Sequence, residues 1–246
     1  MEKEMKMKKG IILMFAAAFI LAGCNNSEKK AEEASESPSD TVATAKRAEK
    51  KAKEVEEQAK TLEEEPLFDI VTSMGTIRVR LYSKTPKHRD NFIHLALSGF
   101  YDSLLVHRVV PDFVIQGGDP YTRDSSHFEQ WGQGGPGYMI SPEFVPEYTH
   151  KKGALAAARS SDIANPMKES HGSQFYLVVS PDNCKHLDGE YTVFGETVSG
   201  LNVIDRISRV RTDKYGRPLK PVRIKSIKPS KANDRRQRPT KRAQNQ

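Results

Sequence analysis

The chain of 246 residues has little of what usually holds a small exported fold together. It contains two cysteines and one tryptophan, and aromatic residues make up 8% of it. Two cysteines allow one disulfide at most, so a packed apolar core must stabilise any folded part. The hydrophobic share of 37% is low for a fully globular chain of this length. Some of the sequence is therefore expected to lie outside a core.

A basic excess spread over the whole chain is also missing. The formal charge of +7 divides into +2 for residues 1–23, −4 for 24–66, +3 for 67–227 and +6 for 228–246. The C-terminal tail therefore carries most of the excess, and the long segment before it is close to neutral. This distribution argues against a nucleic-acid partner, for which a basic folded domain is expected.

The first 23 residues are typical of an export signal. Four lysines precede the apolar run IILMFAAAFILA at 11–22, which is too short to span a membrane but long enough for a signal core. The run ends in LAGC, residues 21–24, which resembles the lipobox of bacterial lipoproteins. That resemblance implies cleavage before Cys24 and lipidation of its sulfur, which would leave Cys184 without an intrachain partner. The alternative is an ordinary signal peptide with an unrelated cysteine.

Two segments lack the apolar residues that a core needs. Residues 24–66 form a charged linker rich in Ala, Glu and Lys, and no aromatic residue occurs in it. Within 45–62, small apolar residues recur at spacings of three and four. This pattern predicts a solvated single helix or, alternatively, an alanine-rich coiled coil that spaces a domain from a membrane. The basic tail, 228–246, is expected to be a disordered solubilising end; the alternative is contact with anionic lipid, cell-wall polymer or nucleic acid.

Between these segments lies a domain, residues 67–227, with the pattern of many short strands and two helices. Alternating apolar residues predict a strand hairpin over 68–83. Thr85 and Pro86 predict a helix start with Thr85 as the N-cap, and a second helix is expected at 200–208. The other strand-like runs are LLVHRVV, FVIQ, GALAAAR, SQFYLVV, YTVFGETV and VRIKSI. Many strands with two helices favour a closed antiparallel barrel or a sandwich.

The motifs of this domain, in their order, resemble those of cyclophilin-type peptidyl-prolyl isomerases. The matching stretches are GTIRVRLYSKTPKHRDNFIHLALSGFYD, HRVVPDFVIQGGDP, GGPGY, GSQFYLVV, HLDGEYTVFGETVSGLNVIDRI and PVRIKSI. The resemblance implies a mostly β fold, an eight-stranded antiparallel closed barrel capped by two α-helices, with a filled interior and an active site on its outer face. It also implies isomerisation of Xaa-Pro bonds without a cofactor, a metal or a covalent intermediate.

Arg108 is the residue whose position this resemblance explains. A guanidinium inside the apolar run LLVHRVVPDFVIQ is costly to bury unless it is paired. Rotation about an Xaa-Pro bond breaks amide resonance against a barrier of about 18–20 kcal/mol, and it makes the prolyl nitrogen a better hydrogen-bond acceptor. A guanidinium held over that nitrogen binds the twisted amide better than the planar one, and such differential binding is catalysis. Arg108 matches the catalytic arginine of the family.

The resemblance also assigns the residues that bind the peptide. An apolar slot for the proline ring is implied for Phe113, Val114, Tyr176 and Leu187. The other members are Gln116, which would orient Arg108 and contact the peptide backbone, Gln174, near the residue before the proline, Ala158 and Arg159, which would offer backbone groups, and His186 and Tyr191 at the rim. Taken singly, the apolar members could be barrel core and the two glutamines could be solvated strand residues. His107 is expected to be structural.

Several features depart from the family pattern or compete with it. Two loops are longer than the common form, YTRDSSHFEQWGQ at 121–133 and SSDIANPMKESH at 160–171, so the family's peptide preference does not carry over. His186 stands where many members have a tryptophan that contacts cyclosporin, which implies weak sensitivity to that inhibitor. GQGGPG at 132–137 lacks the Lys-Ser/Thr of a phosphate loop and is expected to be a turn, and no GxSxG, HExxH or paired CxxC occurs.

Together these features predict a monomeric, lipid-anchored isomerase of the bacterial cell envelope. It would face the periplasm and act on proline-containing unfolded or exported polypeptides. Asn25 follows the cysteine in place of the aspartate that retains some lipoproteins in the inner membrane, so the outer membrane is favoured. Two alternatives stay open, a non-catalytic binding module or chaperone for proline segments, and an envelope scaffold whose tail contacts a polyanion.

Overall fold

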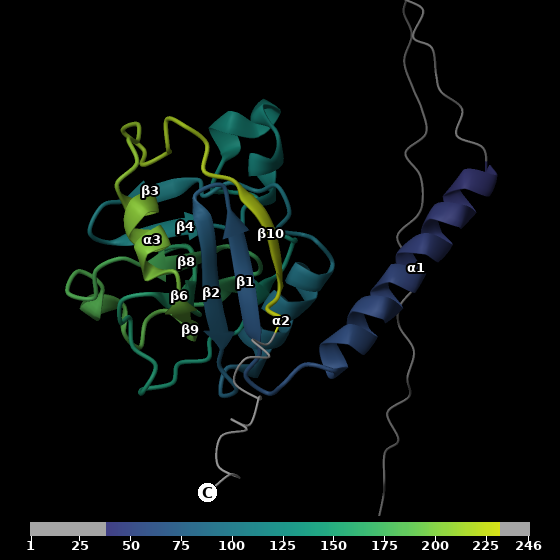
Figure 1. Ribbon diagram of the computed structural model, residues 1–246, viewed down its shortest axis with the longest axis horizontal. Coiled ribbons are helices and arrows are strands. Elements are labelled where there is room, and N and C mark those ends of the chain that lie inside the picture. The colour runs from purple at the N-terminus through teal and green to yellow at the C-terminus, as the bar shows by residue number, and fades with distance from the viewer. Residues whose placement is uncertain (1–37, 232–246) are drawn as a thin grey trace, which may run out of the picture. The chain divides into compact units, whose positions relative to one another are not determined.

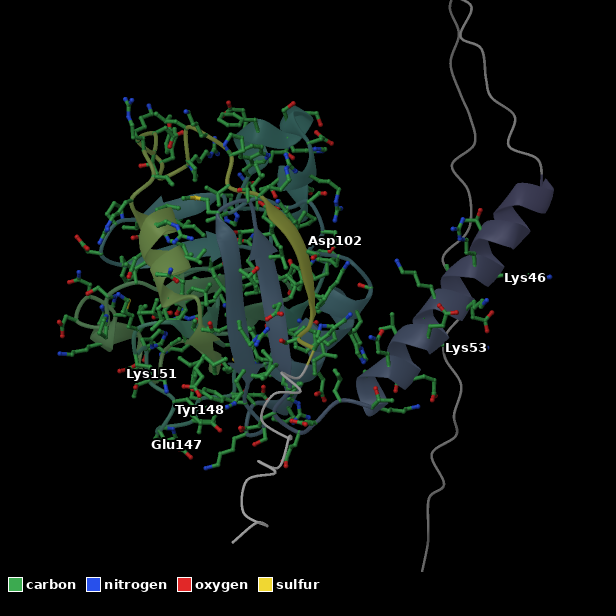
Figure 2. All side chains as sticks on the ribbon, in the orientation of Figure 1. Lys46, Lys53, Asp102, Glu147, Tyr148 and Lys151 are labelled. Carbon is green, nitrogen blue, oxygen red and sulfur yellow. The ribbon has the colours of Figure 1, made fainter. Side chains whose placement is uncertain are left out.

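The computed structural model describes residues 38–231 of the chain (Figure 1). The export signal, Cys24 and the basic tail beyond residue 231 lie outside the described residues. The described part begins with helix α1, Pro38–Lys60. Lysine–glutamate pairs lie along this helix at i,i+4 spacing. Figure 2 shows charged side chains extending from it, Lys46 and Lys53 among them. None of the described helices is long and apolar enough to cross a membrane.

Eight strands form one antiparallel sheet that curls strongly on itself as a half-barrel. The order is β10-β1-β2-β9-β6-β8-β4-β3, and every pairing in it is antiparallel. The strands are β1 Leu67–Thr72, β2 Gly75–Leu81, β3 Arg108–Val110, β4 Val114–Gly117, β6 Ala154–Ala157, β8 Phe175–Val178, β9 Val193–Ser199 and β10 Ile224–Pro229. With its two α-helices, this sheet confirms the predicted fold.

The two edges of the curled sheet meet beside strand β3. The segment that leads into β3 bonds to the beginning of β10 and the residues before it: Val106 N–H donates to Val222 O at 2.9 Å, and Ile224 N–H donates to Leu104 O at 2.7 Å. These bonds satisfy backbone groups that an open sheet edge would expose. Because β3 carries Arg108, this closure fixes the position of that residue from both sides.

Helices α2 (Pro86–Leu97) and α3 (Leu201–Ser208) bury apolar faces against the sheet. The prediction that Thr85 caps α2 is wrong in one respect. Thr85 occupies the N-cap position, but its hydroxyl bonds to Tyr82 O and makes no cap bond. The Glu143 carboxylate accepts the N–H groups of Lys87 and His88 instead, each at 3.0 Å. A carboxylate at a helix N-terminus is also favoured by the helix dipole.

Short elements occupy the two loops at 121–133 and 160–171. Within the first are two turns of 3-10 helix, η1 (Pro120–Arg123) and η2 (Ser125–Gln130), and the predicted turn at 132–137 follows without forming a helix. The second ends in β7 (Ser170–His171), which pairs with β5 (Met139–Ile140) as a separate two-stranded sheet. A third 3-10 turn, η3, spans Lys185–Leu187. The sequence pattern predicted none of these elements.

The interior of the curled sheet is filled by aromatic and aliphatic side chains. Phe92 of α2 is the centre of its aromatic part, because its ring lies 5.3–6.1 Å from the rings of four others, Phe68, Tyr101, Phe175 and Phe194. All five are at most 5% exposed. Such a packed interior is what stabilises a chain that has no disulfide among its described residues.

A second apolar cluster lies on the outer face of the same strands. On β8, Phe175 and Leu177 belong to the interior, whereas the alternate residues Tyr176 and Val178 belong to the second cluster. The outer cluster comprises Tyr82, Val114, Ala154, Ala156, Tyr176, Val178, Cys184, Leu187 and Val193, with Phe113, Tyr148, Ala158 and Tyr191 packed on it. Strand periodicity of two separates the two sets. The residues predicted to form a proline slot are therefore not part of the barrel interior.

Candidate active site

A cavity of about 320 Å³ opens over the outer cluster. Its lining residues come from β3, β4, β8 and the loops after β6 and η3; they are Arg108, Phe113, Val114, Gln116, Ala158, Arg159, Tyr176, Leu187 and Tyr191. Nine of the eleven predicted site residues thus line one cavity. The other two, Gln174 and His186, touch its lining residues from outside. The site is apolar at its floor and polar along one wall.

The polar wall is a chain of hydrogen bonds that begins at Arg108. Arg108 and Gln116 stand directly opposite each other in the β3–β4 pairing, and the guanidinium donates to Gln116 Oε1 at 3.2 Å. Gln116 Nε2 donates to Gln174 Oε1 at 3.0 Å. Gln174 Nε2 then donates to the carbonyls of Gly132 and Gly134 at 2.9 and 3.0 Å. In this row of bonds each glutamine accepts at Oε1 and donates from Nε2, and this determines how its amide group is oriented.

This chain does two things for Arg108. It fixes the guanidinium against the wall of the cavity, and it uses only part of its five donors, so the rest can reach a bound peptide. Gln174 is 3% exposed and is held at both ends, so it acts here as the support of Gln116. The alternative reading of the two glutamines as solvated strand residues is wrong, because they are hydrogen-bonded to each other.

The apolar floor has the size and character of a slot for a small ring. Val114, Tyr176 and Leu187 are each at most 8% exposed, and Phe113 packs on them partly exposed. His186 stacks nearly parallel on Phe113, with ring centroids 6.1 Å apart and planes 9° apart. His186 therefore lies against Phe113, outside the residues that line the cavity.

A buried histidine that the sequence gave no reason to choose supports two sides of this slot. His150 Nδ1 lies 2.7 Å from Asp188 Oδ1, and its Nε2 lies 2.8 Å from the Tyr176 hydroxyl. Asp188 directly follows Leu187 and also accepts the backbone N–H of His150 at 2.7 Å. Burial lowers the pKa of His150, although Asp188 opposes this. The neutral ring therefore donates from Nδ1 to Asp188 and accepts at Nε2 from Tyr176.

The structure corrects the roles of Ala158 and Arg159. Ala158 N–H donates to Gln174 O at 3.0 Å, and its carbonyl accepts from His171 N–H at 2.7 Å. Both backbone groups are therefore hydrogen-bonded within the folded domain. Arg159 keeps its backbone groups free among the described residues. Its side chain is used internally: Nε donates to Glu190 O at 2.9 Å, Nη1 donates to Asp162, and the guanidinium lies 4.3 Å from the centre of the Tyr191 ring. Of the two predicted backbone partners, only Arg159 has a backbone N–H that is free among the described residues.

His107, next to Arg108, is buried and unusual in having no partner. It is 4% exposed, and within the described part of the chain neither ring nitrogen finds a hydrogen-bond partner. Burial, together with the positive charge of Arg108, lowers its pKa to about 4. The ring is therefore uncharged at neutral pH.

Comparison with known proteins gives a consistent result. The family model for cyclophilin-type peptidyl-prolyl cis-trans isomerases matches residues 67–229. Peptidyl-prolyl cis-trans isomerase ppi1 of Schizosaccharomyces pombe is 38% identical over 157 residues, which cover 63% of this chain and 94% of that protein. Isomerase CYP18-2 of Arabidopsis thaliana is 35% identical over 160 residues, 65% of this chain and 90% of its own length. A crystal structure of a cyclophilin-type isomerase from Cryptosporidium parvum superposes with a TM-score of 0.60 at 28% identity, covering 68% of this chain and 98% of that one.

Proposed function

Because the chain belongs to the cyclophilin-type peptidyl-prolyl cis-trans isomerase family and is such an isomerase, we propose that Arg108 carries the reaction on Xaa-Pro bonds of exported proteins. The observation behind this proposal is the position of Arg108 at the edge of the apolar slot, tied to Gln116 and Gln174. The proline ring would sit on Val114, Tyr176 and Leu187. The guanidinium would then face the prolyl amide.

Catalysis of this reaction requires the protein to position the prolyl amide and to place a positive charge beside its nitrogen. As the amide twists, its nitrogen loses conjugation and gains hydrogen-bond basicity. The hydrogen bond that the guanidinium donates to Gln116 Oε1 positions it before the substrate binds, so no reorganisation is needed when the charge develops. The slot holds the ring while the Xaa-Pro bond rotates, and the free backbone of Arg159 can bind the peptide backbone beside the slot. No covalent intermediate is involved.

The test measures cis-to-trans isomerisation of a short Xaa-Pro peptide by the purified full chain and its Arg108→Ala variant. A loss of kcat/KM of about a hundredfold or more is expected, as for removal of one donor that stabilises a transition state. Arg223→Ala is the matched control, because the Arg223 side chain donates to Ser103 O and lies outside the cavity lining. An Arg108→Ala variant that is folded and as active as the control would overturn the proposed role.

The proposed location rests on sequence features alone. We place the protein at the bacterial cell envelope, anchored by lipid on Cys24, facing the periplasm and favouring the outer membrane. Cys24→Ser is expected to move the protein from the membrane fraction to the soluble fraction, while Cys184→Ser leaves it at the membrane. Membrane retention of Cys24→Ser would contradict the anchor.

A second activity is supported by the longer loop at 160–171. Ile163 is 98% exposed and Met167 is 73% exposed, although the loop is held by Asn165, whose Nδ2 donates to Glu169 O and whose Oδ1 accepts the Glu169 N–H. Two apolar side chains held out in water beside Arg159 can bind an unfolded segment. A client-holding role beside isomerisation predicts that Ile163→Ser combined with Met167→Ser weakens suppression of aggregation of an unfolded client but not turnover of a short peptide. Loss of both would contradict it.

A further inference from the structure

The order of the strands gives a direction across the site. Neighbours in the sheet are β6, β8, β4 and β3, so Ala158 after β6 and Arg108 on β3 lie at opposite ends of this row. Beyond β3 the row continues with the turn 213–217. Val109 N–H donates to Gly216 O at 2.7 Å, and a Cβ placed on Gly216 would lie 3.6 Å from Arg108 Cγ. This turn therefore adjoins Arg108 on the side away from Ala158.

The turn carries cations that are held against aromatic rings. The Arg217 guanidinium carbon lies 4.6 Å from the centre of the Phe128 ring and 5.6 Å from that of Tyr215, and Lys214 Nζ lies 4.9 Å from the Tyr215 ring. Phe128 belongs to η2, so the first longer loop and this turn meet here, at the top of Figure 1. Phe128 is 42% exposed and Tyr215 is 64% exposed. The four side chains, Phe128, Lys214, Tyr215 and Arg217, are called the aromatic–cation patch below.

Within the described part of the chain, neither Lys214 nor Arg217 forms an ion pair; Asp213 is the acid in electrostatic reach of them, since both cations lower its pKa, and two positive charges face this one carboxylate. The one acid of the turn, Asp213, uses its Oδ1 to accept the backbone N–H groups of Tyr215 and Arg217 at 2.8 and 2.9 Å. Residues 209–231 contain nine lysines and arginines and only this one acid. On the η2 side, Asp124 caps the 3-10 turn through Ser126 N–H. A guanidinium held between rings, with its donors free, is prepared to bind an anion.

We propose that the aromatic–cation patch is a subsite for an acidic side chain in the peptide segment that follows the proline. This inference rests on the proposed function, which places the proline in the slot and the preceding residue beside the backbone of Arg159. The peptide then leaves the slot past Arg108 and reaches the turn 213–217. The first residues after the proline would then lie beside the patch, because Gly216 of this turn adjoins Arg108.

The chemistry of the patch favours a carboxylate. Arg217 can present two parallel N–H groups to the two oxygens of an aspartate or glutamate, and Lys214 adds a second positive charge. The rings hold the guanidinium in place without neutralising it, which lowers the ordering cost of binding. Because the patch is half open to water, each ion pair contributes modestly and weakens with salt.

The experiment compares two peptides that differ only after the proline, Ala-Ala-Pro-Glu and Ala-Ala-Pro-Gln, each followed by the same reporter group. Wild type is expected to process the glutamate peptide with a kcat/KM about two- to fivefold above that of the glutamine peptide at low ionic strength, with the gain in KM. Arg217→Gln should bring this ratio close to one, and Arg217→Glu should invert it in favour of an Ala-Ala-Pro-Lys peptide. Arg47→Gln on α1, with the same loss of charge, should keep the wild-type ratio.

The kcat/KM values of the two peptides and their ratio distinguish a failure of the proposed function from a failure of the proposed subsite. If wild type isomerises neither peptide, the proposed function of Arg108 fails. If it isomerises both at equal rates, or if Arg217→Glu keeps the preference for glutamate, the subsite is refuted while the isomerase stands. A preference that survives in 0.5 M salt also contradicts the subsite, because screened charges cannot carry it. Phe128→Leu provides a further check. Loss of the ring beside Arg217 should reduce the kcat/KM ratio of the glutamate peptide to the glutamine peptide without removing a charge.

Discussion

The two faces of strands β4 and β8 are built from alternate residues and have opposite characters. Inward, Ile115, Phe175 and Leu177 join an apolar interior with rings packed around Phe92. Outward, Val114 and Tyr176 form the floor of an open cavity beside a chain of charged and amide groups. The same few residues thus supply a stabilising core and a reactive surface one side chain apart.

This difference shows how one sheet can separate stability from activity. The interior contributes free energy by removing apolar surface from water and has little polar chemistry to lose. The outer face leaves donors and an apolar slot unfilled, which costs stability but prepares the site for substrate. Substitutions inside should therefore change the free energy of unfolding, whereas substitutions outside should change kinetic parameters.

The largest effect is expected inside, from Phe92→Ala. Removing a ring in contact with four others leaves a cavity that the packed interior cannot close, so the free energy of unfolding should fall by about 3–5 kcal/mol. Urea denaturation followed by far-UV circular dichroism measures this. Leu219→Ala, at an exposed position, is the control and should change stability by less than about 0.5 kcal/mol. An equal loss of unfolding free energy in both variants would contradict the view that the interior carries the stability.

The next effect concerns His107, which is as buried as the interior but polar. Its folded-state pKa, about 4, lies below the ordinary value of 6.5. Between these values the unfolded chain binds a proton that the folded chain does not. Stability is therefore full above pH 6.5 and is lost as the pH falls toward 4, by about 2 kcal/mol from this residue at pH 5.

His107→Phe removes this titration, so its stability should depend less on pH between 6.5 and 4.5 than that of wild type. Since neither ring nitrogen has a partner among the described residues, the variant should also be as stable as wild type at pH 7, or more stable. Chemical denaturation at a series of pH values measures both. An unchanged pH slope would show that His107 is protonated or paired in solution.

A smaller effect is expected on the outer face from Tyr176→Phe. The change removes one hydroxyl and leaves His150 Nε2 without its donor, so stability should fall by about 1–2 kcal/mol. Because the ring of Tyr176 is then held less firmly beside Leu187, KM should rise a few-fold with kcat nearly constant. Tyr148→Phe, which packs on the outer cluster but lies outside the cavity lining, is the matched control and should leave both quantities unchanged. A drop in kcat alone would mean that the hydroxyl acts on the reacting amide.

The smallest effect is expected at Cys184, in the outer cluster. Burial raises the pKa of its thiol to about 11, so about one molecule in a thousand carries the thiolate at pH 8. Alkylation by iodoacetamide should therefore be far slower in the native protein than in urea, and it should follow unfolding. Rapid alkylation of the native chain would show that the outer cluster opens much more easily than the interior.

Much of the fold could be predicted because its signals are local. The hairpin of β1 and β2, the limits of α2 and the strand runs depend on period-two or helical patterns within a few residues. The pairing of Arg108 with Gln116 is local as well, since the two residues lie eight positions apart in one hairpin. The family motifs added the assignment of the slot residues, which the pattern alone left open between core and site.

The remaining features join side chains that are far apart in the sequence. Glu143 caps a helix 55 residues away, and Gln174 supports Gln116 across 58 residues. His150 links Tyr176 to Asp188 across 26 and 38 residues. No local pattern marks such residues, because their partners are selected by how the strands curl and where the loops fall.

The sequence by itself determined the main strands and helices and the family, and it singled out Arg108, because periodicity and short motifs are properties of neighbouring residues. The tertiary structure alone decided which backbone groups stay free beside the slot, where His150 lies, and that Arg217 meets Phe128 next to Arg108. These depend on contacts between distant segments, and such contacts exist only once the sheet has closed.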